Sequence, residues 1–136
     1  MSKIKIFSLG GLNENGKNMY VVEVDKSLYI FDAGLKYDVE HNLGIDYIIP
    51  SFDYLIKNNK RIFLSHGHEG NIGAVPDIIS KLGDVPIYGG KLTLEILRLD
   101  LAEAGVKKAN LHEIKAHRKL NFGKESIFPI AMTHSI

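Results

Sequence analysis

Short runs of apolar residues separated by turn residues predict that the chain begins with strands. Ile4–Leu9 is rich in apolar and β-prone residues and predicts a strand, and the loop Gly10–Asn18, rich in glycine and asparagine, follows it. Met19–Val24 and Leu28–Phe31 are two further runs joined by a short turn, a spacing typical of a β-hairpin. The pattern therefore predicts three strands before the first helix.

Apolar residues at helical spacing occur only after residue 50. Ser51–Lys57 predicts a short helix with Ser51 as its N-cap. Ile72–Leu82 carries an apolar stripe at intervals of three and four residues, which predicts a longer helix. Leu92–Ala104 has similar spacing and is followed by Gly105, a residue type favoured directly after a helix end.

Further strands alternate with these helices. They are predicted at Arg61–Leu64, Val85–Tyr88, Leu111–Ile114 and Ser126–Met132, whereas Tyr37–Pro50 shows no regular pattern. A pair of strands followed by alternating helices and strands indicates a layered α/β domain.

The chain ends soon after its last predicted strand. Ile127–Ile130 has the composition of a core strand, and Thr133–Ile136 adds no closing element to it. Because 136 residues correspond to one domain or part of one, we expect the chain to be a fragment of a larger domain.

Composition excludes several classes of chemistry. The chain is 45% hydrophobic and 24% charged, which is typical of a globular protein, and it contains no cysteine. Disulfides, cysteine-ligated zinc and a cysteine nucleophile are therefore excluded, and we expect a cytoplasmic location. A net charge of +1 argues against a surface dedicated to coating nucleic acid. The N-terminus lacks a signal-peptide pattern, and the absence of a long apolar run predicts no membrane partner.

Two histidines follow the predicted strand Arg61–Leu64. His66 and His68 are two residues apart, so in extended backbone both side chains point to one side, roughly 6–7 Å apart. Gly67 allows a tight turn between them. Two imidazoles in this arrangement can bind one ion with bonds of about 2.0–2.1 Å. Such a pair by itself is nevertheless more often a simple surface-loop feature.

The positions of the other histidines strengthen the metal interpretation. His134 also follows an apolar strand, so three histidines at strand ends predict a site with an open fourth position, the arrangement of catalytic zinc. His41, His112 and His117 have no such setting, and we expect them to be ordinary solvated histidines.

Two further patterns have structural interpretations that we favour. Gly10–Lys17 lacks the Gly-Lys-Ser/Thr ending of a phosphate-binding loop, because Asn18 follows the lysine. The basic run Lys115–Lys119 has the charge to touch RNA phosphates, but a solvated turn between strands explains it more simply.

Several segments together resemble a known family. The loop Ser65–Asn71 is similar to the His-x-His-x-Asp-His signature of the metallo-β-lactamase superfamily, and Phe31–Gly34 is similar to its preceding Asp-x-Gly motif. The opening Leu9–Met19 resembles the LGGLGEIGKNM-type start of the ribonuclease J family. Ile72–Pro76 is similar to the helix after the signature, and Thr133–Ile136 to the next metal-binding motif of that family.

This resemblance implies a fold, a cofactor and a substrate, and it implies that residues 1–136 are the N-terminal part of a metallo-β-lactamase-like domain. The family has an αββα sandwich fold, two metal ions that are usually zinc, and a 5′-to-3′ exonuclease and endonuclease activity in bacterial RNA maturation and decay. His66, His68 and His134 match the ligands of the first metal, and Asp32 matches a residue that supports the site.

The sequence departs from the family at the second metal. Gly70 stands at the signature aspartate and Asn71 at the following histidine, so we expect one zinc ion and doubt the second. Glu69 is the only acid in the loop, and its offset makes it a poor replacement, so we expect a solvent-facing charge there.

Three hypotheses remain open at this point. The first is a weakly active RNA-processing subunit, homo-oligomeric or in complex with an active paralogue, like the second ribonuclease J paralogue of Gram-positive bacteria. The second is a competent hydrolase with a single zinc. The third is a metal-free scaffold that makes protein contacts only.

Overall fold

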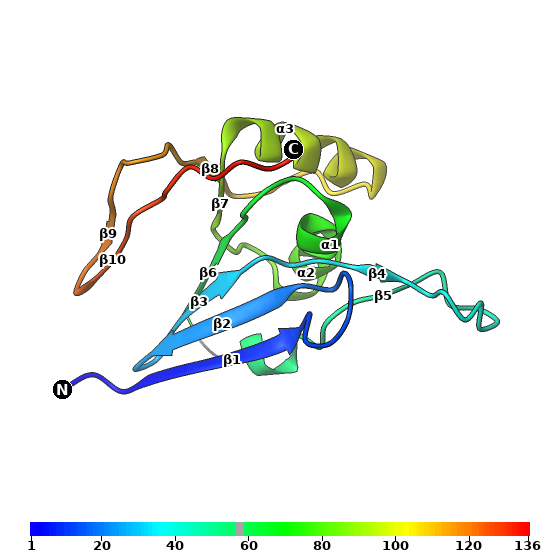
Figure 1. Cartoon of the computed structure of the whole chain (residues 1–136), viewed down its shortest axis with the longest axis horizontal. Coiled ribbons are helices and arrows are strands. Elements are labelled where there is room, and N and C mark those ends of the chain that lie inside the picture. Colours follow the sequence, from blue (N-terminus) through cyan, green and yellow to red (C-terminus); the bar gives the residue numbers. More distant parts are fainter. Residues whose placement is uncertain (57–58) are drawn as a thin grey trace.

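The computed structural model describes residues 1–56 and 59–136, and within these residues a six-stranded sheet forms the centre of the fold (Figure 1). Its strands lie side by side in the order β1-β2-β3-β6-β7-β8. They comprise β1 (Ile4–Gly10), β2 (Met19–Val24), β3 (Ser27–Phe31), β6 (Asn59–Phe63), β7 (Ile87–Gly89) and β8 (Leu111–Glu113).

The sheet is antiparallel at one side and parallel at the other. β1, β2 and β3 pair antiparallel, which confirms the predicted hairpin, and β3, β6, β7 and β8 pair parallel. Phe31 lies opposite Phe63 in the β3–β6 pair, so both strands end at the same edge. The residues that follow them, Asp32 and the histidine loop, are therefore brought together at this edge.

Helices cover one face of the sheet. They are α1 (Glu69–Ile72), α2 (Val75–Leu82) and α3 (Lys91–Glu103). The core lies between this face and the helices, and its fully buried side chains include Val21, Ile30, Ile62, Ile78 and Leu97. Burying each such aliphatic side chain contributes roughly 1.5–3 kcal/mol. The predicted layered α/β arrangement is confirmed.

Helix α3 agrees with its predicted range to within one residue. Its sequence was expected to be helical over Leu92–Ala104, and the helix spans Lys91–Glu103. Gly105 follows with a φ of +74°, a left-handed conformation that glycine adopts without the steric cost of a side chain.

The helix predicted at Ile72–Leu82 is instead two helices. α1 begins earlier, at Glu69 within the loop that we expected to be irregular, and ends at Ile72, and α2 begins at Val75. Pro76 explains the break, because it has no N–H to donate to the carbonyl of Ile72 and is tolerated only in the first turn of a helix.

The helix predicted at Ser51–Lys57 is also wrong in type and extent. The segment forms a single 3₁₀ turn, η1 (Asp53–Leu55), with Phe52 at its N-cap and no side-chain capping bond. Ser51 instead bonds the carboxylate of Asp53 at 3.3 Å. Lys57 lies outside the described residues.

The strand predicted at Ser126–Met132 is mostly absent. A short hairpin of β9 (Leu120–Phe122) and β10 (Glu125–Ile127) takes its place, and residues 128–136 form no strand. Phe128, Ile130 and Met132 are exposed, because no neighbouring strand in the described part of the chain pairs with this segment. The expectation of a core strand at Ile127–Ile130 is therefore wrong.

The segment Tyr37–Pro50, which was expected to be irregular, contributes to a small ribbon. β4 (Lys36–Tyr37) and β5 (Tyr47–Ile48) pair antiparallel at its base, and the ribbon projects from the sheet edge (Figure 1). A search of the described residues finds no helix with the length and apolar character that crossing a membrane requires.

Candidate metal centre

Strand β6 carries the two histidines of the loop to the edge of the sheet. Phe63 and Leu64 are only 5% and 3% exposed, and the backbone N–H of Leu64 donates to the carbonyl of Tyr88 at 2.8 Å. This buried anchor fixes the backbone directly before His66. His68 then lies at the N-cap of α1, with extended backbone, so the loop is held at both ends.

Three imidazoles meet at this edge. The ring centroids of His66 and His134 are 3.9 Å apart. The ring centroid of His68 lies 4.8 Å from that of His66 and 4.9 Å from that of His134. One nitrogen from each ring lies within 4.8 Å of the others, so these three histidines of the described residues are close enough to hold a metal ion. Nitrogens sharing a tetrahedral ion lie about 3.3 Å apart, from bonds of about 2.0–2.1 Å, so small side-chain rotations would suffice.

The donor set suits zinc and leaves the centre open. Imidazole is a good ligand for Zn²⁺, and catalytic sites use three protein ligands and keep one position free. His66 and His68 are half-buried and His134 is exposed, so the cluster faces solvent on one side. The residues therefore fit a single zinc ion with an accessible fourth position.

Asp32 lies beneath this cluster at the end of β3. It is 8% exposed and has a φ of +66°, a left-handed conformation that aspartate tolerates better than most residues. Its carboxylate accepts hydrogen bonds from the Ser65 N–H at 2.8 Å, the Ser65 hydroxyl at 2.9 Å and the Asn71 side-chain amide at 2.8 Å. These bonds tie the ends of β3 and β6 to α1.

Two serines contact the ring nitrogens of the loop histidines. Ser65 Oγ lies 2.9 Å from Nδ1 of His66, and Ser135 Oγ lies 3.4 Å from Nε2 of His68. The nitrogens without these contacts are Nε2 of His66 and Nδ1 of His68, which are the atoms available to an ion. Sequence analysis did not identify either serine, although both are direct sequence neighbours of proposed ligands.

Burial lowers the pKa of His66 from its usual 6.5, and charge on His134 lowers it further, while Asp32 opposes the shift. The folded pKa lies below the unfolded one, so the unfolded chain binds the proton more readily. The stability that neutral His66 contributes is therefore present above pH 6.5 and is lost as the pH falls below that value.

We predict that proton NMR of the metal-free chain will place the His66 titration midpoint below 6.5. The free energy of unfolding should decrease as the pH falls through this window, and replacing His66 with glutamine should remove that part of the pH dependence. A midpoint at or above 6.5 would contradict the role of burial.

The two positions that depart from the resembled signature, Gly70 and Asn71, make hydrogen bonds to neighbouring loop residues. Gly70 has no side chain, and its carbonyl accepts hydrogen bonds from the backbone N–H of Asn18 at 3.0 Å and from the Asn18 amide at 2.9 Å. A Cβ added at Gly70 would lie 3.2 Å from the Cα of Gly16. The side-chain amide of Asn71 donates a hydrogen bond to Asp32, so it points toward the residue that supports the three-histidine cluster.

Close packing behind the loop requires glycine at position 34. A Cβ there would overlap the carbonyl group of Gly70, and the N–H of Gly34 donates to the carbonyl of Asn18 at 2.9 Å.

We predict that Gly34→Ala lowers the free energy of unfolding by about 3 kcal/mol, as measured by urea denaturation. Gly90→Ala is the matched control, because its Cβ meets open space and its φ is −66°. Equal effects of the two changes would show that the packing is loose.

The remaining polar candidates lie away from the three histidines. His41, His112 and His117 are exposed, as predicted. Glu69 is exposed as well, and its hydrogen bond with the hydroxyl of Tyr37 is the main cause of a raised pKa of that tyrosine. Glu69 therefore contacts the β4 end of the ribbon.

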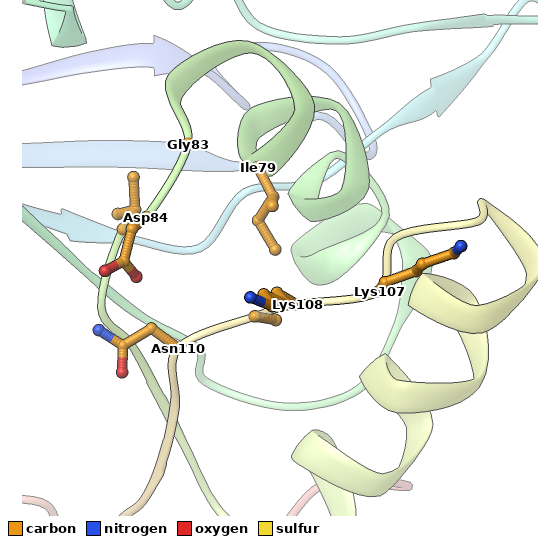
Figure 2. Close-up of a pocket in the computed structure, with 8 residues that line it drawn as sticks. Ile79, Gly83, Asp84, Lys107, Lys108 and Asn110 are labelled. Carbon is orange, nitrogen blue, oxygen red and sulfur yellow. The ribbon is translucent and has the colours of Figure 1, made fainter.

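One pocket is separate from the metal centre. A concavity of about 750 Å³ lies between the loop after α2 and the loop before β8, with Asp84, Lys107 and Asn110 in its wall (Figure 2). Figure 2 shows Lys107 directed away from Asp84. Asp84 precedes β7 and Asn110 precedes β8, so the pocket lies at the amino ends of these strands. Ligand sites of open α/β sheets lie at the carboxyl ends, where the histidines are.

Comparison with known proteins agrees with this fold. The model of the metallo-beta-lactamase superfamily matches residues 12–131, and the chain therefore belongs to that superfamily. Its fold is accordingly an N-terminal portion of the αββα arrangement, with helices on one main sheet.

Several ribonucleases J are similar to this chain along its whole length. Ribonuclease J2 of Bacillus subtilis (strain 168) is 42% identical over 137 residues, which cover 98% of this chain and 24% of that protein. Ribonuclease J 2 and Ribonuclease J 1 of Streptococcus pyogenes serotype M3 are 39% and 38% identical over 100% and 99% of this chain, and 25% of each. The chain thus spans about a quarter of the length of these relatives.

A solved structure has the same fold at lower sequence similarity. A protein of unknown function from Enterococcus faecalis V583 superposes with a TM-score of 0.66 at 18% identity, covering 91% of this chain and 36% of that one. At this identity the likeness supports the fold alone.

Proposed function

We propose that this chain belongs to a ribonuclease J-like protein with one zinc site, whose hydrolytic activity on RNA is weak and which supports an active paralogue. The observation that carries the proposal is the convergence of His66, His68 and His134 beside two positions, Gly70 and Asn71, that offer no second set of ligands. The ribonuclease J homologues supply the substrate class, which is RNA.

The proposed chemistry divides between the ion and the chain. His66, His68 and His134 would hold a zinc ion, which when bound would supply Lewis acidity toward a phosphodiester. The residues of the chain bind and orient: β6 fixes His66, and Asp32 holds the loop. The exposed side at His134 gives a phosphodiester access to the centre.

The missing second ion explains why the expected activity is weak. A second Lewis acid stabilises the transition state by roughly several kcal/mol in two-metal hydrolases. At about 1.36 kcal/mol per factor of ten, its loss reduces the rate on the order of a thousandfold. A protein that keeps the fold and one ion retains the capacity to bind RNA and to associate with an active subunit.

The same relatives support a proposal for the physiological setting. We place the protein in the cytoplasm, as a homo-oligomer or in a complex with an active ribonuclease J paralogue, in rRNA processing and mRNA decay. Co-purification of the natural gene product with its paralogue, and a loss of RNA decay rate when the contact is broken, are the observations that this setting requires.

Metal content tests the proposed site directly. Elemental analysis of the purified natural protein, after loosely bound ions are removed, should find about one zinc per chain. No bound metal would instead favour a scaffold that makes protein contacts only. Two ions per chain would show that position 70 or 71 does not prevent a second site, and the proposal of a weak enzyme would fail.

A further inference from the structure

The carboxylate of Asp32 is compensated entirely by neutral donors. It is 8% exposed, and no salt bridge to it is present in residues 1–56 and 59–136. A buried carboxylate without a cation depends on hydrogen bonds, and those to charged groups are about twice as strong as neutral ones. Two of its three donors come from Ser65, and the third is Asn71.

Counting protons fixes the direction of each hydrogen bond. A carboxylate only accepts, so the Asn71 side chain must present its NH₂ group to Asp32. The Ser65 hydroxyl has a single proton, and it donates that proton to Oδ2 of Asp32 at 2.9 Å. Its oxygen then remains as an acceptor for Nδ1 of His66, 2.9 Å away.

This direction determines the tautomer of His66. If Ser65 Oγ accepts from Nδ1, the neutral ring carries its proton on Nδ1 and its lone pair on Nε2. A metal binds the nitrogen that carries the lone pair, and the bond made by the other nitrogen selects which one that is. Asp32 thus acts on His66 through Ser65.

Asn71 stabilises this chain of hydrogen bonds from Asp32 through Ser65 to His66. Its amide and the Ser65 hydroxyl both bond Oδ2 of Asp32, at 2.8 Å and 2.9 Å, while the Ser65 N–H bonds Oδ1 at 2.8 Å. Of the three bonds to the Asp32 carboxylate, two come from Ser65 and one comes from Asn71. The Asn71 bond therefore helps to set the rotation of this carboxylate. Without it, Oδ2 loses the contact that orients it toward the Ser65 hydroxyl.

We propose that Asn71 and Ser65 are positioning residues of the remaining half-site. Asn71 acts through Asp32, and Ser65 contacts His66 directly, so that Nε2 of His66 is presented to the metal. Asn71, at a position that would bind a second ion in the family signature, thereby serves the first. The inference rests on the proposed zinc site. It gives Asn71, which stands where the signature has a histidine, a function in the first metal site.

Histidine tautomers and metal affinity together test this role. Nitrogen-15 NMR of the metal-free chain should show His66 protonated on Nδ1, and Ser65→Ala should abolish that preference. Competition against a chelator should show zinc binding weakened by about 10- to 100-fold in Ser65→Ala and in Asn71→Asp, which replaces the donor with an acceptor. Ser65→Thr keeps the hydroxyl and should restore both readouts.

Ser126→Ala is the matched control, because it removes an exposed serine hydroxyl in β10. An unchanged tautomer and unchanged zinc affinity in Ser65→Ala would overturn the proposal, as would equal effects of Ser65→Ala and Ser65→Thr. A wild-type chain that binds no zinc would contradict the proposed function instead. The tautomer comparison, made without metal, would still decide the role of Ser65.

Discussion

Replacing His68 with alanine is expected to abolish stoichiometric zinc binding. Two histidines would remain, and bound zinc is held by three protein ligands even in sites with an open position. Loss of an outer-shell partner weakens affinity by about 10- to 100-fold, so loss of a direct ligand should weaken it by more than about 100-fold. Isothermal titration with zinc, and elemental analysis after dialysis, measure this directly.

A matched variant separates this effect from the general loss of an imidazole. His41→Asn removes an exposed histidine in the ribbon, and asparagine tolerates the φ of +52° found there. Zinc binding should be unchanged in this control. Retention of stoichiometric zinc by His68→Ala would mean that the ion binds elsewhere, and the proposed centre would be wrong.

The elements that carry the site were predictable because their signals are local. The hairpin formed by Met19–Val24 and Leu28–Phe31, the strand before His66 and the helix that ends before Gly105 each depend on neighbouring residues. The i, i+2 spacing of His66 and His68 also predicted their proximity. Their meeting with His134 followed from the resemblance and from its place after an apolar segment, and the structure brings the three rings together.

The contacts that were not predicted are long-range. The bonds that Asp32 accepts span 33 residues to Ser65 and 39 to Asn71, and that between His68 and Ser135 spans 67. Such bonds depend on the parallel pairing of β3 with β6, which no pattern within one segment specifies. The proposed ligands were therefore predictable from the sequence, whereas the two serines that contact their ring nitrogens were not.

Errors in the elements have a similar origin. The apolar stripe at Ile72–Leu82 is continuous, but Pro76 divides it, because a proline tolerates only the first helical turn. Residues 128–136 have strand-like composition, yet a strand requires a hydrogen-bonded neighbour, and none pairs with them in the described part of the chain. Composition alone could not supply that neighbour.

Restoring the signature by Gly70→Asp with Asn71→His in the natural gene product is expected to increase RNA hydrolysis on the order of a thousandfold. The two changes return a carboxylate and an imidazole at the positions of the second metal in the family, and zinc content should rise from about one to about two ions per chain. Single-turnover cleavage of a 5′-labelled RNA measures the gain.

The structure sets the conditions under which this rescue can work. The new Cβ at position 70 would lie 3.2 Å from the Cα of Gly16, so the loop Gly10–Asn18 must move by a few tenths of an ångström. The histidine at position 71 also gives up the amide bond to Asp32, which costs about 1–3 kcal/mol if the carboxylate loses a donor. We therefore expect the double variant to be less stable than the parent while it is more active.

Adding His68→Ala to the double variant is the control, because it removes a ligand of the first ion and should cancel the gain. High activity of the unaltered protein, without the two changes, would contradict the weak-subunit hypothesis and favour a competent single-zinc hydrolase. A double variant that binds two ions and gains no activity would place the defect outside residues 70 and 71. The low activity of that variant would then be due to the residues that bind RNA, since its metal centre would be complete.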